Sequence, residues 1–457
     1  MNLIDKILTR LHLSETKQKV VRNLFWAVTG KVVTLLGSLL VGIFVARYLG
    51  PEQYGLMNYV VSFVALFQVF ASFGLDNIEI REESKCKGTG EKGRVPGTEA
   101  NTILGTAFGL KLIFAGITML LVILTAWLFE ADTFTKWMIT LYSLSMIMDT
   151  FGVIRNYFTS IVWNEYIVKT EISRTIIGAL IKVVLLLLHA PLAWFIAASL
   201  FDTILIAGGY LLSYRKQIAS PRLWTFDLPT AKYLIKEAFP LLLSGAAVVV
   251  YQKIDQVMIG NMIDKANVGY YAVAGAFVNV AVFIPNIICQ TLTPLLVQYY
   301  NTNRNLYQQR AQLFLNIMVW SSIVFAALVC VLAYPIVRYT YGLQYIEAVP
   351  VLQILVFKIV GTAMMSSSGN LMITEGVHRY AAMRNGLACV ANVALNLILI
   401  PKLGIVGAAI AGVVALMVAG YFAHFVIPPY FRFIKPQTKS ILLGWKDLVN
   451  IRKLMKE

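Results

Sequence analysis

Long apolar segments follow one another along this chain with little polar sequence between them, and this pattern constrains the fold most. Of the 457 residues, 58% are hydrophobic and only 14% are charged, whereas soluble domains carry about 25% charged residues. Many of the apolar segments reach the roughly 20 residues that an α-helix needs to cross a bilayer. The sequence therefore predicts an all-α, polytopic membrane protein and excludes a large soluble core.

Twelve membrane-spanning helices are predicted. No small-residue cleavage motif follows the first apolar run, so we expect it to remain as a span rather than to be removed as a signal peptide. The predicted spans are 23–46, 54–78, 101–128, 135–158, 167–188, 191–213, 239–263, 268–298, 311–337, 349–374, 378–400 and 404–428.

The distribution of basic residues predicts the orientation of these spans. If the N-terminus is cytoplasmic, most of the 39 Lys and Arg residues, Arg155 among them, fall on the cytoplasmic side. This asymmetry is what the positive-inside rule requires. Both termini are therefore predicted to be cytoplasmic, and the net charge of +16 needs no nucleic-acid partner to explain it. The basic residues on the opposite side are Arg47, Lys136, Lys265, Arg338 and Lys402.

The longest connection between hydrophobic blocks follows the sixth span and divides the chain into two lobes of six helices. The halves resemble each other weakly, and their alignment places Gly55 opposite Gly269. An even number of helices in each half predicts a parallel repeat about an axis along the membrane normal. The predicted parts are an amphipathic N-terminus (1–22), an N-lobe (23–213), a cytoplasmic linker (214–238), a C-lobe (239–428) and a basic cytoplasmic tail (429–457).

Both ends of the chain carry apolar side chains at helical spacing among basic residues. Leu3–Leu11 shows this pattern near the N-terminus, and Trp445, Leu448, Ile451 and Leu454 show it in the tail. Basic amphipathic helices bind the anionic inner leaflet. For the tail, a merely solvated segment is an equal alternative.

Five lysines lie inside predicted spans, and they indicate what the protein handles. A lysine that faces lipid at mid-bilayer costs about 3 kcal/mol even on the lenient insertion scale. The economical interpretation is that several of them line a water-filled cavity, which favours an anionic cargo. These substrate-binding candidates are Lys31, Lys253, Lys358, Lys111 and Lys182.

Other interpretations of the intramembrane polar residues remain open. Lys31 and Lys111 can snorkel to an interface, and Lys253 can form an ion pair with Asp255 or Asp149. Ser, Thr and Asn at helical spacing, such as Asn392 in the eleventh span, are expected mostly to bond across helix interfaces.

The sequence gives no support for the catalytic or nucleotide-binding motifs of soluble enzymes. Gly88–Gly93 fits G-x-G-x-x-G, but it lies between two spans with no βαβ unit, so we interpret it as a loop. The chain has no Walker sequence, and its four histidines form no metal or catalytic cluster. No catalytic residue, metal or cofactor is predicted.

Three segments carry a resemblance to a known family. "NLFWAVTGKVVTLLGSLLVGIFVARYLGPEQYG" (23–55) resembles the opening of polysaccharide (O-antigen unit, Wzx-type) flippases of the MATE/MOP exporter superfamily. "PLLLSGAAVVVYQKIDQVMIGNMIDKANVGYYAVA" (240–274) resembles the start of their second lobe, and "GLD" at Gly74–Asp76 is similar to their second span. The resemblance implies a V-shaped bundle of two six-helix lobes.

The resemblance also implies a function. A protein of this family is expected to move undecaprenyl-diphosphate-linked oligosaccharide across the bacterial inner membrane by alternating access, using a cationic cavity. The lysines fit this expectation, and Asp255, Asp149 and Asp76 are candidates to bind a coupling H⁺ or Na⁺. A polysaccharide polymerase and chain-length machinery are expected partners.

Three rival functions remain at this point. A multidrug or ion antiporter of the same superfamily would favour carboxylates over lysines in its lumen. A membrane enzyme such as an O-antigen polymerase or ligase would be expected to carry a long, basic outer loop. A scaffold without transport activity would tolerate loss of the intramembrane charges.

Overall fold

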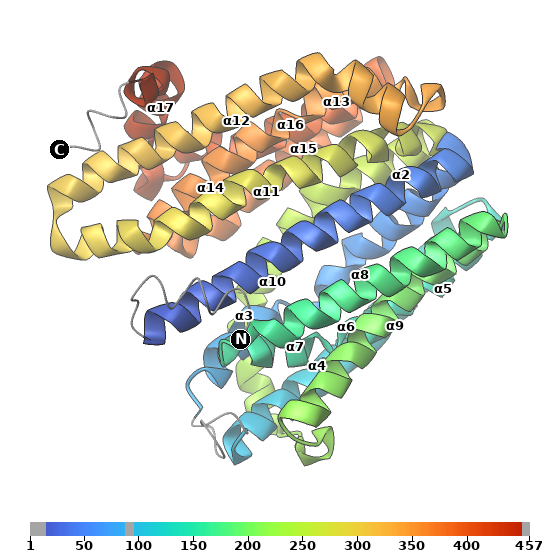
Figure 1. Cartoon of the computed structure of the whole chain (residues 1–457), viewed down its shortest axis with the longest axis horizontal. Helices are drawn as coiled ribbons and strands as arrows, with labels where there is room; N and C mark the ends of the chain where they lie inside the picture. Colours follow the sequence, from blue (N-terminus) through green and yellow to red (C-terminus); the bar gives the residue numbers. More distant parts are fainter. Residues whose placement is uncertain (1–14, 87–95, 450–457) are drawn as a thin grey trace. The chain divides into compact units, whose positions relative to one another are not determined.

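The computed structural model describes residues 15–86 and 96–449, and within these ranges every regular element is a helix (Figure 1). The Gly88–Gly93 motif and most of the predicted N-terminal segment lie outside the described residues. The all-α, membrane-spanning prediction is confirmed.

The described chain packs into two compact units. Unit 1 contains Met1–Gly42 and Phe67–Leu242, and unit 2 contains Ile43–Leu66 and Leu243–Glu457. The units differ from the predicted lobes because 43–66 lies in unit 2 and the predicted linker, 214–238, lies in unit 1.

Unit 1 is built from part of one very long helix, several complete helices and the start of α10. Within it, α8 packs against α9, α5 packs against both α4 and α9, and α3 packs against α7 (Figure 1). Its helices are α2 (Glu15–Ser72, shared with unit 2), α3 (Leu75–Glu83), α4 (Thr98–Phe129), α5 (Thr133–Ser143), α6 (Ser145–Asp149), α7 (Gly152–Ser160), α8 (Asn164–Leu187), α9 (Leu192–Gln217) and α10 (Leu228–Met262, shared with unit 2).

Unit 2 is built from part of α2, the end of α10 and the helices that follow it. Here α15 pairs with α16, α14 packs against α11, α12 and α16, and α17 packs against α12 (Figure 1). The helices are α11 (Lys265–Thr302), α12 (Arg304–Thr340), α13 (Ala348–Leu355), α14 (Lys358–Thr374), α15 (Ala381–Leu403), α16 (Ile405–Gly420) and α17 (Phe431–Val449). Short 3₁₀ turns occupy Pro221–Leu223, Leu343–Tyr345, His378–Tyr380, Phe422–Phe425 and Pro428–Tyr430.

The helices are compatible with twelve spans. In the described ranges, nine helical segments are long and apolar enough to cross a membrane, and the first of them, Gly30–Ser72, covers two predicted spans. That segment bends at Gly50, whose φ of 71° suits a glycine, and Pro51 follows. The remaining two predicted spans correspond to α8 and to the shorter apolar helix α16.

Three of the predicted spans are not continuous helices in the structure. The second breaks at Phe73 and Gly74, which have positive φ, the fourth divides into α5, α6 and α7, and the tenth divides into α13 and α14. Membrane helices tolerate such breaks where the freed backbone lies within protein or lines a cavity. The charged residues Asp76, Asp149 and Lys358 lie next to these breaks.

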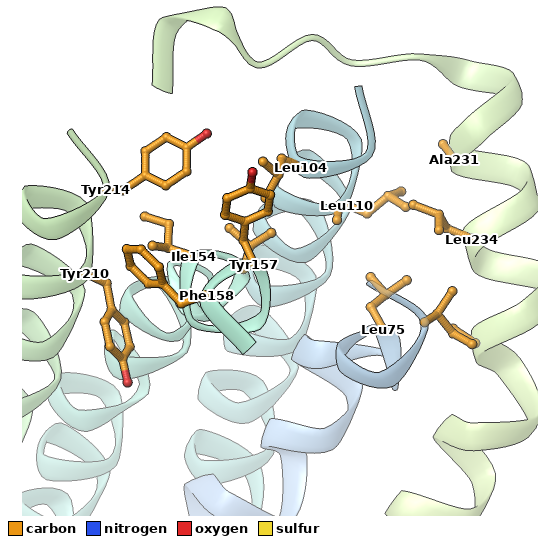
Figure 2. Close-up of a cluster of buried hydrophobic side chains, with 14 of the residues drawn as sticks. Leu75, Leu104, Leu110, Ile154, Tyr157, Phe158, Tyr210, Tyr214, Ala231 and Leu234 are labelled. Carbon is orange, nitrogen blue, oxygen red and sulfur yellow. The ribbon is translucent and has the colours of Figure 1, made fainter. Parts of the chain in front are cut away.

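The core of unit 1 joins α3, α4, α7, α9 and the start of α10 (Figure 2). Leu75, Leu104, Ile154 and Phe158 are almost completely buried in it. The predicted linker closes this core: the Trp224 indole N–H donates to the Tyr214 hydroxyl at 3.0 Å. The segment after the sixth span is therefore packed against unit 1.

The C-terminal helix α17 belongs to unit 2. Its Gln437, Ser440 and Gly444 are buried, and the Trp320 indole of α12 donates to the Ser440 carbonyl at 2.9 Å. Its Lys439 and Trp445 are exposed, as a basic amphipathic helix requires. Ile451 and Leu454 of the predicted amphipathic pattern lie outside the described residues.

The two glycines aligned by the internal repeat meet in unit 2. A Cβ on Gly55 would lie 2.8 Å from the Gly269 backbone nitrogen and would collide with the Lys265 carbonyl oxygen. A Cβ on Gly269 would collide with the Pro51 carbonyl oxygen. Both obstacles are backbone atoms, so the starts of the two helical segments approach this closely only because both positions lack a side chain.

We expect Gly55→Ala and Gly269→Ala each to lower the melting temperature of the detergent-purified protein, because overpacking costs about 1–3 kcal/mol. Gly275→Ala is the matched control on α11, since no heavy atom lies within 4 Å of its added Cβ. Thermal unfolding of the three variants provides the test. Equal melting temperatures for Gly269→Ala and Gly275→Ala would contradict the close approach.

Candidate functional site

The five intramembrane lysines fall into two groups. Lys111, Lys182 and Lys358 each form an ion pair with at least one carboxylate of their own unit. Lys31 and Lys253 form no ion pair or hydrogen bond with any residue in the described ranges. Three of the five candidate substrate-binding lysines are therefore already paired with carboxylates in the described structure.

Lys111 forms the centre of the polar cluster in unit 1. Its side chain is only 2% exposed, and its Nζ lies 2.8 Å from Asp76 Oδ1 and 2.7 Å from Glu79 Oε1. The Asn156 side-chain amide donates to Asp76 Oδ1 at 2.8 Å and to Glu79 Oε2 at 2.6 Å. We call Lys111, Asp76, Glu79 and Asn156 the unit 1 cluster.

The local fold explains how this cluster forms. The break at Phe73 and Gly74 ends α2 and starts α3 in a new direction. Asp76 and Glu79 are three residues apart on α3, so both carboxylates lie on one face of that helix. This arrangement lets α3 present two carboxylates to one ammonium from α4 and one amide from α7.

A cavity of about 320 Å³ lies beside the unit 1 cluster. Asp76 and Lys111 are part of both, and Arg155, Asp149 and Glu171 add further charges to the wall. Asp149 is exposed and accepts a hydrogen bond from the Gln68 side-chain amide at 2.7 Å. The cavity therefore carries both signs of charge and is large enough for several water molecules, each of which occupies about 30 Å³ in the liquid.

The third lysine of unit 1 is paired separately. Lys182 Nζ of α8 lies 2.6 Å from Asp202 Oδ2 of α9. Gly178, one turn before Lys182, leaves room for this carboxylate, because a Cβ there would collide with Asp202 Oδ1. Lys182 therefore links two adjacent helices.

Unit 2 contains a second polar cluster, centred on Asp255 of α10, which is completely buried. Lys358 Nζ lies 3.0 Å from Asp255 Oδ2, and the Tyr271 hydroxyl donates to the same oxygen. The amides of Asn392 and Asn396 donate to Asp255 Oδ1 at 3.0 and 2.8 Å. We call these five residues the unit 2 cluster.

The unit 2 cluster depends on one helix break and one glycine. Lys358 is the first residue of α14, directly after the break that separates it from α13. A Cβ on Gly412 of α16 would collide with Lys358 Nζ and lie 2.9 Å from Asp255 Oδ2. The absence of a side chain at residue 412 therefore leaves room for the ion pair in this position.

The ion pair that the sequence suggested as an alternative for Lys253 does not form. Asp255 pairs with Lys358, and Asp149 bonds to Gln68 in unit 1. Lys253 lies two residues before Asp255 on α10 and is partly buried. Lys31, on α2, is exposed.

Several residues of these clusters were not predicted from the sequence. Glu79 and Asp202 were missed as partners, although the i, i+3 spacing of Asp76 and Glu79 was a signal. Arg155, assigned by charge counting to a cytoplasmic segment, lines the unit 1 cavity. Arg384 of α15 was also assigned to the cytoplasmic side, but it is 8% exposed and its Nε has no partner in the described residues.

A family model described as polysaccharide biosynthesis protein matches residues 20–300, more than half of the chain. The chain belongs to the polysaccharide biosynthesis protein family. No curated protein sequence matches it. The resemblance stated from the sequence motifs is thereby confirmed.

Solved structures show which fold this polysaccharide biosynthesis protein has. It is similar to an inward-facing multidrug resistance MATE family transporter of the MOP superfamily, with 16% identity, a TM-score of 0.66, and coverage of 89% of this chain and 96% of that chain. It is also similar to the lipid II flippase MurJ in an inward closed conformation, with 16% identity, a TM-score of 0.65, and coverage of 93% and 92%.

A third similar structure is a MOP superfamily transporter from Pyrococcus furiosus, described by the reverse polarity of its binding pocket, which suggests a different function for that protein. The identity is 16%, the TM-score is 0.56, and the alignment covers 91% of this chain and 97% of that chain. At these identities the similarity establishes the fold of a multi-pass membrane protein and leaves the cargo to be argued from residues.

Substitution of Lys111 by Met is expected to destabilise unit 1 strongly, because removing one partner of a buried ion pair costs about 3–5 kcal/mol. Adding Glu79→Gln should restore part of that loss, since it removes one uncompensated carboxylate. Lys31→Met is the control at an exposed, unpaired lysine and is expected to change stability by about 0.5 kcal/mol or less. Thermal unfolding in detergent measures all three, and a Lys111→Met protein as stable as Lys31→Met would refute the buried pair.

Proposed function

We propose that this protein is a flippase that moves lipid-linked oligosaccharide carrying a diphosphate across the bacterial inner membrane by alternating access. The cargo expected from the family resemblance is an undecaprenyl-diphosphate-linked repeat unit of O-antigen or another polysaccharide. Membership of the polysaccharide biosynthesis family and the fold shared with MOP superfamily transporters support this proposal.

The proposal of an anionic cargo rests on one observation: some of the intramembrane lysines are paired with carboxylates in the described part of the chain and others are not. Three of them are neutralised within their own unit, whereas Lys31 and Lys253 retain an uncompensated ammonium in the described structure. A partly buried ammonium without a counter-charge is costly. A phosphate group would supply that counter-charge to Lys253.

The chemistry of the cargo explains why a protein is needed. A diphosphate and several sugar hydroxyls cannot enter hydrocarbon unaided, because each unpaired polar group costs several kcal/mol. Lys253 would bind the diphosphate while the polyprenyl chain stays in lipid, and Lys31 is a second candidate to bind phosphate. Lys111, Lys182 and Lys358 would then contribute by holding helices together, and each would meet cargo only after leaving its carboxylate.

The expected orientation places both termini in the cytoplasm. It rests on the concentration of Lys and Arg in alternate connections. Loading from the cytoplasmic leaflet follows from this orientation. A polymerase and chain-length machinery on the other side of the membrane would receive the product.

A coupling ion would reset the transport cycle, with H⁺ and Na⁺ as the candidates. Asp255 is the least accessible of the three proposed carboxylates, because Lys358, Tyr271 and two asparagines surround it. Asp76 and Asp149 both line the unit 1 cavity, which gives them access to water. Unit 1 is therefore the better location for coupling.

A multidrug antiporter is the second candidate, on the evidence of the shared fold. Cationic drugs require available carboxylates, but Asp76, Glu79, Asp202 and Asp255 already bind lysines. The pairing of these four carboxylates with lysines therefore favours an anionic cargo.

The test is flipping of a fluorescent undecaprenyl-diphosphate oligosaccharide in proteoliposomes. Lys253→Ala is expected to reduce the rate about tenfold or more, since a hydrogen bond to a charged group contributes about 1.5–3 kcal/mol. Lys253→Arg should retain most of the activity because it keeps the positive charge.

Lys232→Ala is the matched control, because Lys232 lies on the same helix and its side chain is exposed. It should flip the cargo at the wild-type rate. Wild-type rates for Lys253→Ala would remove this lysine from the cargo path. Transport of cationic dyes by the wild-type protein, without flipping of the oligosaccharide, would favour the antiporter.

A further inference from the structure

Helix α3 carries a third buried carboxylate, which the clusters described above do not use. Glu83 lies seven residues after Asp76 and four after Glu79, so all three acids share one face of the helix. The Glu83 side chain is 3% exposed. Neither of its carboxylate oxygens has a hydrogen-bond partner in the described residues.

The nearby side-chain donors Asn156, Ser160, Arg81 and Lys85 bind acceptors other than Glu83. The Asn156 amide donates to Asp76 and Glu79, and the Ser160 hydroxyl donates to the Tyr157 carbonyl oxygen at 2.8 Å. Arg81 and Lys85, on the same segment, bind Glu82, and Arg81 also binds Glu237.

The charges of this region do not balance if every acid is ionised. Lys111 and the nearby Arg155 bring two positive charges, whereas Asp76, Glu79 and Glu83 bring three negative charges, and Asp76 is the most exposed of the three. An isolated, buried carboxylate costs several kcal/mol and takes up a proton instead. Burial and the neighbouring Glu79 carboxylate raise the pKa of Glu83 well above its ordinary value, against smaller opposing effects of Lys111 and Ser160.

We propose that Glu83 is a proton-binding site, protonated in the conformation described here, and that its proton is the coupling ion of transport. The proton leaves Glu83 for water that enters through the unit 1 cavity, whose wall includes Asp76 and Lys111. The carboxylate that remains competes with Glu79 for the single ammonium of Lys111. Release of the proton therefore changes how α3 is held against α4.

The other titratable groups near Glu83 cannot replace it as the acid. Tyr157 of α7, Tyr214 of α9 and Cys86 interact with its charge. Burial raises the pKa of Cys86 to about 11, and a tyrosine hydroxyl ordinarily titrates near a pKa of about 10. Glu79 already binds Lys111 and Asn156, whereas Glu83 has no such partner in the described ranges, so Glu83 is the group proposed to exchange a proton.

Thermal unfolding as a function of pH tests the proton site without any cargo. A carboxyl whose pKa is raised by folding stabilises the protein at low pH, and that contribution is lost as the pH rises through the folded-state value. Glu83→Gln keeps the shape of the protonated acid but cannot ionise. We expect the variant and the wild type to melt together at low pH, and the variant to melt several degrees higher at high pH.

A second measurement covers the case in which Glu83→Gln fails to fold. The infrared spectrum of the wild-type protein should contain the C=O stretch of a protonated, buried carboxyl that disappears at high pH, and Glu83→Asp should shift it. Glu82→Gln is the control on the same helix and should leave the band unchanged. A pH-independent melting difference for Glu83→Gln, or no such band, would overturn the proposal.

The coupling role rests on the proposed flippase function. Two further assays test the proton site and the flippase function separately. In proteoliposomes, a pH gradient should drive flipping by the wild type, whereas Glu83→Gln should bind cargo yet ignore the gradient. A protonated Glu83 without oligosaccharide flipping would reject the function and retain the proton site. A melting temperature that responds to NaCl in the wild type but not in Glu83→Gln would instead assign Na⁺ to the site and overturn the proposal.

Discussion

The requirement that an ammonium inside a membrane must find a counter-charge organises both units of this structure. Lys111 ties α4 to α3 and, through the shared Asn156, to α7. Lys358 does the same for α14 and α10, with α11 and α15 completing the shell around Asp255. Removing one charge would leave its partner uncompensated in a medium of low dielectric, which is destabilising. The ion pairs therefore determine which helices must stay adjacent.

The same requirement explains why the unpaired groups are candidates to bind a ligand. Lys253 lacks a carboxylate, and Glu83 lacks a cation or any other donor in the described residues. A missing counter-charge favours a ligand of opposite sign, and on this ground we propose a phosphate for the lysine and a proton for the acid. The paired residues hold the helices, whereas the unpaired ones are available for cargo and for coupling.

Sequence patterns predicted the elements of this fold better than the contacts between them. Hydrophobic run length predicted twelve spans, with which the helices are compatible, and the weak repeat aligned two glycines that meet in space. The partners of Lys111 and Lys182 depend on how each helix is rotated and where it breaks, and neither follows from periodicity. Glu79 and Glu83 were missed because the second span was expected to end at 78, although a new helix, α3, begins at Leu75.

Binding of undecaprenyl diphosphate to the purified protein, measured by native mass spectrometry, tests the division between paired and unpaired lysines most directly. The account predicts that Lys31→Met with Lys253→Met abolishes binding. Lys182→Met with Asp202→Asn, which removes a complete ion pair, should leave binding intact. Retained binding in the first double variant and loss in the second would contradict the account.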